Sequence, residues 1–316
     1  MIMNIKNKKV VITGGAGFIG SNLAEEVAKD NVVIIIDDIS TGKIENIKDL
    51  IKKENVNFVK GSITDLNILQ RTFRNVDYVF HQAAIPSVPR SVKDPITTNE
   101  VNVKGTLNVL IASRDNNVKK VVYASSSSVY GDTPELPKRE NMKTNPLSPY
   151  AITKLTGEYY CEIFSEIYGL STISLRYFNV FGPKQDPLSE YAAVIPKFIK
   201  RVLENKPPII YGDGEQTRDF TFVKDVVRAN ILAAESKENG VFNIASGKRI
   251  TINELAKKIM EILEKDMEPI YENPRKGDIR HSLADISKAK VLSYKPEYNL
   301  ENGLKHMIRW FLNAKI

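Results

Sequence analysis

The chain has 316 residues, of which 42% are hydrophobic and 26% are charged, a composition typical of a soluble globular protein large enough for two lobes. No apolar run approaches the length of a membrane span, and the first residues, MIMNIKNKK, lack the apolar stretch of a secretory signal, so we expect a cytoplasmic protein with no membrane partner. The net charge is +7, but the lysines are scattered, which favours a solvated basic surface over nucleic-acid binding.

Cysteine and histidine are too rare to build a disulfide framework or a metal centre. Cys161 is the only cysteine, so an internal disulfide is excluded and a reducing compartment fits. The three histidines, His81, His281 and His306, do not cluster with carboxylates or thiols, and we predict no metal site. We interpret His81 as a hydrogen-bonded strand-end residue and Cys161 as a packing residue.

The chain begins with a predicted strand, a glycine-rich turn and a helix. The β-branched run 10–13 predicts a buried strand, and apolar residues at helical spacing follow in 20–29. Between them, in KVVITGGAGFIG, Gly14 and Gly17 would let the backbone approach a pyrophosphate at the helix N-terminus. Asp37 ends the next strand, where a carboxylate can accept both ribose hydroxyls and would repel a 2′-phosphate. The segment therefore predicts a dinucleotide site for NAD rather than NADP.

Strands and helices alternate through the first 180 residues. This alternation predicts an α/β fold, a Rossmann-type doubly wound parallel sheet with helices on both faces. Ligands of such sheets bind beyond the carboxyl ends of the strands, where the strand order reverses, and small or polar residues follow each predicted strand here. The predicted strands are 10–13, 32–36, 56–59, 76–81, 118–125 and 171–177, and the predicted helices are 20–29, 65–74, 97–114 and 150–168.

Prolines interrupt this alternation beyond residue 180. We predict an NAD-binding domain over 1–180, with a return segment near 220–245, and a smaller mixed α/β lobe over 181–316 that closes a cleft at the strand ends. A capping box, Thr251 with Glu254, opens one helix of this lobe. The predicted helices are 191–204, 225–236, 251–264 and 300–313, and the predicted strands are 208–211, 220–223 and 241–245.

Three side chains form a candidate catalytic group. Tyr150 and Lys154 are four residues apart and share one face of a predicted helix. A lysine ammonium one turn away favours the phenolate of a tyrosine whose ordinary pKa is about 10. Ser126, at the end of a predicted central strand, can bond the same substrate oxygen. Beside a nicotinamide, these groups predict hydride transfer at an alcohol carbon.

The motifs TGGAGFIG, YASSSSVYG, SPYAITK and RYFNVFGP resemble those of the extended short-chain dehydrogenase/reductase family, in its sugar-nucleotide branch. The resemblance runs from Val10 to about Leu292. It implies that Tyr150 is the catalytic base, that Lys154 also holds the nicotinamide ribose, and that Ser126 is the third catalytic residue.

Within this branch the chain is most similar to UDP-hexose 4-epimerases. The resemblance implies an enzyme that keeps NAD bound and oxidises C4 of the sugar. The 4-keto sugar then turns over, and the hydride returns to its opposite face. Relatives are commonly dimers joined by the helices corresponding to 97–114 and 150–168, so we expect a homodimer. The implied NAD-binding residues are Gly14, Gly17, Phe18, Ile19, Asp37, Asp38, Ile39, Ser40, Thr41, Gly42, Ser62, Ile63, Gln82, Ala83, Ala84, Ile85, Asn102, Ala124, Tyr150, Lys154, Tyr177 and Phe178. The implied UDP-sugar residues are Ser87, Ser126, Tyr150, Asn179, Val194, Lys197, Tyr211, Arg218, Arg275, Asp278 and Ser282.

Departures from the family pattern carry information about the substrate. Ser127 and Ser128 stand where the related 4,6-dehydratases have an Asp-Glu pair, which disfavours dehydration. The Gly-Asp-Ile motif at the adenine reads Gly61-Ser62-Ile63, which puts one adenine hydrogen bond in doubt. Ser282 occupies a position often filled by Tyr in glucose-only epimerases. A small side chain there predicts that UDP-GlcNAc is accepted along with UDP-glucose.

Two alternatives stay open on the sequence alone. One is a UDP-glucuronate 4-epimerase or decarboxylase on the same fold, from which Asn179 and the lack of a Glu near Ser126 separate the chain. The other is a non-catalytic NAD- or RNA-binding protein, which would tend to lose the Tyr, Lys or Ser of the catalytic group. All three are present, and we therefore favour the enzyme, with no nucleic-acid partner.

Overall fold

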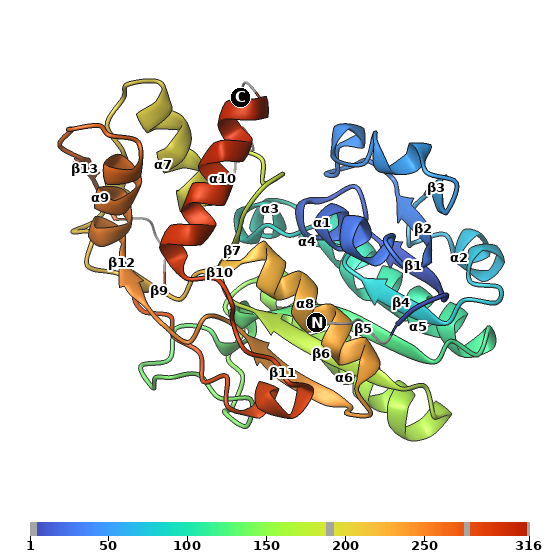
Figure 1. The fold of residues 1–316 in the computed structure, drawn as a ribbon. Helices are drawn as coiled ribbons and strands as arrows, with labels where there is room; N and C mark the ends of the chain where they lie inside the picture. Colours follow the sequence, from blue (N-terminus) through green and yellow to red (C-terminus); the bar gives the residue numbers. More distant parts are fainter. Residues whose placement is uncertain (1–4, 188–192, 275–278, 315–316) are drawn as a thin grey trace.

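A computed structural model describes residues 5–187, 193–274 and 279–314 (Figure 1). Its centre is a seven-stranded sheet in the order β11-β6-β5-β4-β1-β2-β3, and every neighbouring pair is parallel. The order reverses between β1 and β4, which places the expected ligand site at their carboxyl ends. The strands are β1 (Lys9–Thr13), β2 (Val32–Asp37), β3 (Val56–Lys60), β4 (Tyr78–His81), β5 (Lys120–Ser126), β6 (Thr172–Tyr177) and β11 (Gly240–Ile244).

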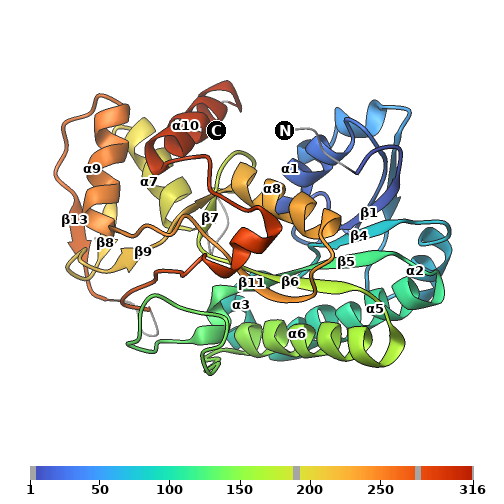
Figure 2. The same cartoon turned by 60° about the horizontal axis from the view of Figure 1, so that its bottom comes forward.

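Helices cover both faces of the sheet, as Figure 2 shows, and the predicted doubly wound fold is confirmed. On one face α1 (Phe18–Val27) packs beside α8 (Val223–Glu235), and on the other α2 (Leu66–Thr72), α5 (Gly105–Asp115) and α6 (Pro149–Tyr168) lie in a row. Each face has its own apolar core, because strand residues alternate between the two sides. Leu23 and Val226 belong to the first core, and Val109 and Phe164 to the second.

Two local features differ from the predicted elements. The predicted helix 97–114 is α4 (Pro95–Asn99), one π-helical turn, η3 (Glu100–Lys104), and then α5. Such turns are rare inside α-helices and are frequent at functional sites. A further short helix, α3 (Val88–Lys93), begins after the Ser87 side chain accepts a hydrogen bond from the Arg90 amide, with proline near its start.

A separate apolar core unites α7 (Val194–Leu203), α9 (Ile252–Ile262) and α10 (Leu300–Ala314). The predicted capping box at Thr251 is present at the start of α9. Short strand pairs complete this part: β10 (Thr221–Phe222) with β7 (Val180–Phe181), β12 (Ile250–Thr251) with β9 (Thr217–Arg218), and β13 (Ile270–Glu272) with β8 (Ile209–Tyr211). Short 3₁₀ helices in the described part of the chain are η1 (Ile44–Asn46), η2 (Leu50–Lys52), η4 (Ser127–Tyr130) and η5 (Lys288–Leu292). Among the described residues, no helix combines the length and apolarity that a membrane crossing requires.

Candidate active site

A cleft of about 870 Å³ lies at the carboxyl ends of the central strands. Its wall contains most of the residues predicted to bind the cofactor and one further predicted substrate residue, Ser87. This volume falls within the usual range of ligand pockets. The predicted residues that line it are Gly14, Gly17, Phe18, Ile19, Asp37, Asp38, Ser40, Thr41, Ser62, Ile63, Gln82, Ala83, Ala84, Ile85, Ala124, Tyr150, Lys154 and Tyr177.

Four predicted cofactor residues are not on this wall, and two of them form hydrogen bonds with residues that are. The four are Ile39, Gly42, Asn102 and Phe178. The Ile39 amide donates to Asp37, and a Cβ at Gly42 would lie 2.9 Å from the Asp37 carboxylate. Asn102 is buried and bonds to the backbone of Ile85. Phe178 is also fully buried.

The glycine turn fits a dinucleotide on steric grounds. Gly14 has a φ of 68°, and a Cβ there would lie 2.6 Å from the Cα of Ala83, so only glycine suits this position. Gly17 caps α1 without a side-chain hydrogen bond. The first-turn N–H groups of α1 are therefore free of side-chain caps beside the cleft, the arrangement that binds a pyrophosphate.

Asp37 ends β2 with a carboxylate that still has acceptor capacity. Its two oxygens accept backbone hydrogen bonds from Ala16 at 2.9 Å and Ile39 at 2.8 Å. A carboxylate has about four acceptor positions, so further ones stay free for ribose hydroxyls. Burial raises the pKa of Asp37, and the two amides act against this rise. The residues present thus fit the adenosine end of NAD.

The three proposed catalytic side chains converge at the other end of the cleft. Ser126 ends β5, where its side chain accepts a 3.2 Å hydrogen bond from the Ser128 amide, and it lies near Tyr150, the second residue of α6, whose burial-raised pKa it lowers. The Lys154 Nζ atom lies 5.9 Å from the centre of the Tyr150 ring. It also donates a 2.7 Å hydrogen bond to the Ala124 carbonyl, which fixes the buried ammonium next to the strand end. A phenol, a cation and a hydroxyl therefore face one region.

Burial and neighbouring groups set the protonation of this trio. Burial raises the pKa of Tyr150, and the Ser126 hydrogen bond counteracts it. Burial lowers the pKa of Lys154 to about 7, with Cys161 and Glu158 acting in the opposite direction. Lys154 can therefore gain or lose its proton near neutral pH, and an anionic phenolate beside it would favour the protonated ammonium.

Part of the predicted substrate set gathers beyond the end of β6. The Asn179 Nδ2 atom lies 3.4 Å from the Ser282 Oγ atom and donates to the Asp219 carbonyl at 3.0 Å. The Ser282 amide donates to Thr217, the residue before Arg218. Asn179, Arg218 and Ser282 therefore lie in one neighbourhood, although they are separated by up to 103 positions in the chain.

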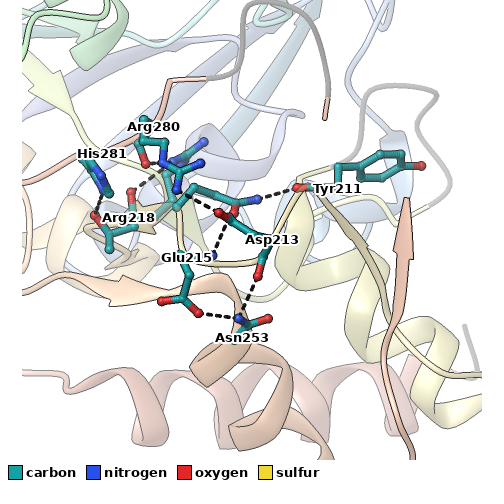
Figure 3. Close-up of polar contacts among 9 residues, drawn as sticks. Tyr211, Asp213, Glu215, Arg218, Asn253, Arg280 and His281 are labelled. Carbon is teal, nitrogen blue, oxygen red and sulfur yellow. Dashed lines mark hydrogen bonds and ion pairs between the residues drawn. The ribbon is translucent and has the colours of Figure 1, made fainter. Parts of the chain in front are cut away.

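Figure 3 shows the surroundings of Arg218. Its guanidinium donates to the carbonyl of Arg280, whose own side chain pairs with Asp213 at 2.8 Å. The Tyr211 ring points away from this cluster, and the Tyr211 carbonyl accepts from Gln216. Val194 and Lys197 lie in the first turns of α7, next to Ala193 on the cleft wall. Arg275 and Asp278, the remaining predicted residues, lie outside the described residues.

The cleft also contains cations that the sequence did not indicate. Arg90 and Lys93 of α3 line it on one side, and Lys43 and Lys184 line it on the other. Lys184 bonds to Glu25 of α1 and to the Asn46 carbonyl. Of these four, only Lys43 could have been found from the sequence, because it directly follows the predicted loop 37–42.

Comparisons with known proteins agree with this geometry. The model of the NAD dependent epimerase/dehydratase family matches residues 10–245. A "Putative UDP-glucose 4-epimerase" of Methanocaldococcus jannaschii is 41% identical over 96% of this chain and 98% of its own length.

Solved structures are also similar to the chain in sequence and in fold. The UDP-N-acetylglucosamine 4-epimerase of Methanobrevibacter ruminantium M1, solved with UDP-N-acetylmuramic acid, is 48% identical, with a TM-score of 0.96 over 98% of this chain and 100% of its own. The UDP-glucuronic acid 4-epimerase of Bacillus cereus, solved with UDP-glucuronic acid and NAD, is 33% identical, with a TM-score of 0.90 over 97% and 99% of the two chains.

These findings confirm three predictions: the family resemblance, an enzyme of the isomerase class, and NAD as the cofactor. The relatives include epimerases named for different sugars, UDP-N-acetylglucosamine and UDP-glucuronic acid. The chain belongs to the NAD dependent epimerase/dehydratase family.

Proposed function

We propose that the chain is a UDP-hexose 4-epimerase that retains NAD and interconverts UDP-glucose with UDP-galactose and UDP-GlcNAc with UDP-GalNAc. The observation that carries the proposal is the convergence of Ser126, Tyr150 and Lys154 at one end of the cleft. Every side chain needed for proton transfer at a sugar hydroxyl is present there. The dehydratase alternative lacks its acid-base pair, because Ser127 and Ser128 follow Ser126.

NAD, held by the residues of the cleft around the glycine turn and Asp37, would supply the acceptor and later the donor of the hydride at the C4 carbon. Tyr150 takes the proton of the C4 hydroxyl, with its phenolate stabilised by the nearby Lys154 ammonium. Ser126 bonds the same oxygen and so holds it next to the tyrosine. Lys154 stays in place through its hydrogen bond to the Ala124 carbonyl. After the 4-keto sugar turns over, Tyr150 returns the proton.

The acceptance of UDP-GlcNAc rests on Ser282. Its small side chain lies beside Asn179, and a tyrosine in its place would occupy room that an N-acetyl group at C2 needs. The 48% identity to a UDP-N-acetylglucosamine 4-epimerase supports the same substrate. A second candidate substrate is UDP-glucuronate, which the 33% identity to a glucuronate epimerase favours.

The proposal extends to the organisation of the protein. We assign NAD binding to residues 1–180 with a return segment near 220–245, and UDP-sugar binding to 181–316, with a cytoplasmic location. A homodimer is supported by an exposed apolar row on α6 at spacings of seven, four and four residues, which places the side chains on one helix face. This row consists of Ile152, Tyr159, Ile163 and Ile167.

One incubation series tests the function. Purified protein, without added cofactor, is mixed separately with UDP-GlcNAc, UDP-glucose and UDP-glucuronate, and the C4 configuration is followed by proton NMR. We expect the galacto isomers of the first two to appear without net oxidation. Turnover of UDP-glucuronate alone would favour the second candidate. A strict need for added NAD, or accumulation of an oxidised sugar, would contradict internal hydride return.

A further inference from the structure

His81 is a buried ionisable residue that the proposed mechanism does not use. It ends β4, and both ring nitrogens are hydrogen-bonded to threonine hydroxyls. Nδ1 lies 2.8 Å from the Oγ1 atom of Thr13 on β1, and Nε2 lies 2.9 Å from the Oγ1 atom of Thr106 on α5. The imidazole therefore joins two strands and a helix.

The donor directions fix the tautomer of this ring. Thr106 Oγ1 lies 2.6 Å from the Asn102 carbonyl, which can only accept, so the hydroxyl proton points there. The Tyr123 hydroxyl also interacts with Thr106 but does not change this direction, because it can itself donate. Thr106 must then accept from His81, so Nε2 carries the ring proton. Nδ1 is left as the acceptor for the Thr13 hydroxyl.

One end of this chain of bonds reaches the catalytic helix. Asn102 lies in the π-helical turn, and its side chain bonds both backbone groups of Ile85, at 2.8 and 3.3 Å. Its Nδ2 atom also donates to Thr153 Oγ1 at 3.0 Å, and this hydroxyl donates to the Tyr150 carbonyl at 2.8 Å. Asn102 thus connects its helix to the first turn of α6.

The other end reaches the glycine turn. Thr13 immediately precedes Gly14, and its hydroxyl accepts a 3.3 Å hydrogen bond from the Ala83 amide. Ala83 is the residue whose backbone leaves no room for a Cβ at Gly14. The contact between β1 and β4 at the cofactor site is therefore held by the same threonine that His81 orients.

We propose that His81, in its Nε2–H tautomer, is a positioning residue that couples the cofactor-binding glycine turn to the helix carrying Tyr150. Through Thr13 it holds the turn, and through Thr106 and Asn102 it holds the start of α6. Each hydroxyl in the chain donates once and accepts at least once. With the other ring tautomer, Thr106 would have to donate to Nε2 and would lose its bond to the Asn102 carbonyl, which can only accept. This inference about His81 rests on the proposed epimerase function in one respect only, the role of Tyr150 as the base.

The tautomer can be tested without turnover. In protein labelled with ¹⁵N-histidine, two-bond nitrogen–proton correlations distinguish protonated from bare ring nitrogens. Only three histidines are present, so a His81→Gln variant assigns the signal. We expect a protonated Nε2 and a bare Nδ1 for His81. An Nδ1–H tautomer, or a doubly protonated ring at pH 7.5, would overturn the proposal.

Isosteric threonine variants test the coupling. Thr106→Val removes the hydroxyl between His81 and Asn102 at nearly constant volume. Thr72→Val is the matched control, since the Thr72 hydroxyl makes a similar bond, to the Ile68 carbonyl within α2. We expect Thr106→Val to lower kcat for UDP-GlcNAc at least tenfold with KM within twofold, and Thr106→Ser to restore most of it. Equal kcat values for Thr106→Val and Thr72→Val would refute the coupling.

The glycine-turn arm has a separate readout, the amount of NAD that copurifies with the protein. Thr13→Val should release at least half of the NAD that the wild type retains, while Thr72→Val should retain all of it. Unchanged NAD content in Thr13→Val would count against the role at the turn. If the wild type turns over no UDP-sugar, the proposed function fails, whereas the tautomer and the NAD content still decide this inference.

Discussion

The Arg176 guanidinium donates two hydrogen bonds to the Glu158 carboxylate, from Nε to Oε1 at 2.8 Å and from NH2 to Oε2 at 2.7 Å. The two side chains are only 4% and 3% exposed. Ser125 donates a further short hydrogen bond to the same carboxylate. Glu158 lies one helical turn after Lys154, so this bidentate pair ties the catalytic helix to strands β5 and β6.

Removing the charge of Glu158 is therefore expected to destabilise the fold strongly. Glu158→Gln would leave the Arg176 cation buried without its counter-charge, which costs about 3 to 5 kcal/mol. Urea unfolding followed by circular dichroism measures this as a lower midpoint. Glu166→Gln, an exposed change on the same helix, should leave the midpoint unchanged. A Glu158→Gln midpoint close to that of the control would show that the pair contributes little.

Tyr150→Phe is expected to lower kcat by about 10² to 10⁴, because the proton acceptor is lost while the ring still fills its place. Initial rates with UDP-glucose and UDP-GlcNAc measure the effect. Tyr168→Phe is a suitable control, since Tyr168 lies at the end of the same helix and is 50% exposed. Near-normal turnover in Tyr150→Phe would exclude this residue as the base.

The environment of His81 predicts an acid-sensitive fold. Burial lowers the pKa of His81 to about 3, and the Lys154 ammonium acts in the same direction. The unfolded chain has an ordinary histidine pKa of about 6.5 and so takes up a proton first. The stabilisation from the neutral ring is complete above pH 6.5 and is lost as the pH falls towards 3. Between pH 6.5 and 5 the loss is about 2 kcal/mol.

Comparing wild type with His81→Gln isolates this contribution, since carboxylates elsewhere titrate in both proteins. The urea midpoint of the wild type should fall more steeply between pH 7 and pH 5 than that of His81→Gln. Parallel pH profiles would mean that the ring gains a proton in the folded state too.

The sheet and the glycine turn could be predicted because their signals are local. Buried parallel strands are β-branched runs, and the residues that follow them meet at one edge whatever the rest of the chain does. The π-helical turn could not be predicted, since nothing in the helical spacing of 97–114 marks one extra residue in the turn around Asn102. Strands of two residues, such as β7 and β9, are too short for any periodicity.

Predicting the site had a similar limit. Asp37 and Tyr150 follow from their position in one motif each. By contrast, the contact between Asn179 and Ser282 joins segments 103 positions apart, and only the folded chain brings them together beside Asp219. Lys184 reaches the cleft from a left-handed backbone conformation, with a φ of 71°, that propensity does not foresee for lysine.

Ser282→Tyr is expected to separate the two substrates. The larger side chain would take the room of the N-acetyl group, so kcat/KM should fall at least tenfold for UDP-GlcNAc and stay within threefold for UDP-glucose. Ser282→Ala, which removes only the hydroxyl beside Asn179, should keep both activities. Equal losses for both sugars in Ser282→Tyr would remove Ser282 from the C2 pocket.

The proposed dimer can be broken by one charge in the apolar row of α6. Ile163 is 43% exposed and lies at the middle of this row, flanked by Tyr159 and Ile167. If the row is an interface, Ile163→Lys buries an unpaired ammonium there, so light scattering after gel filtration should report monomers instead of dimers. Leu312→Lys, an equally drastic change at a 58% exposed residue of α10, should leave the dimer intact. A wild type that is monomeric at micromolar concentration, or an Ile163→Lys variant that stays dimeric, would rule out this face as the interface.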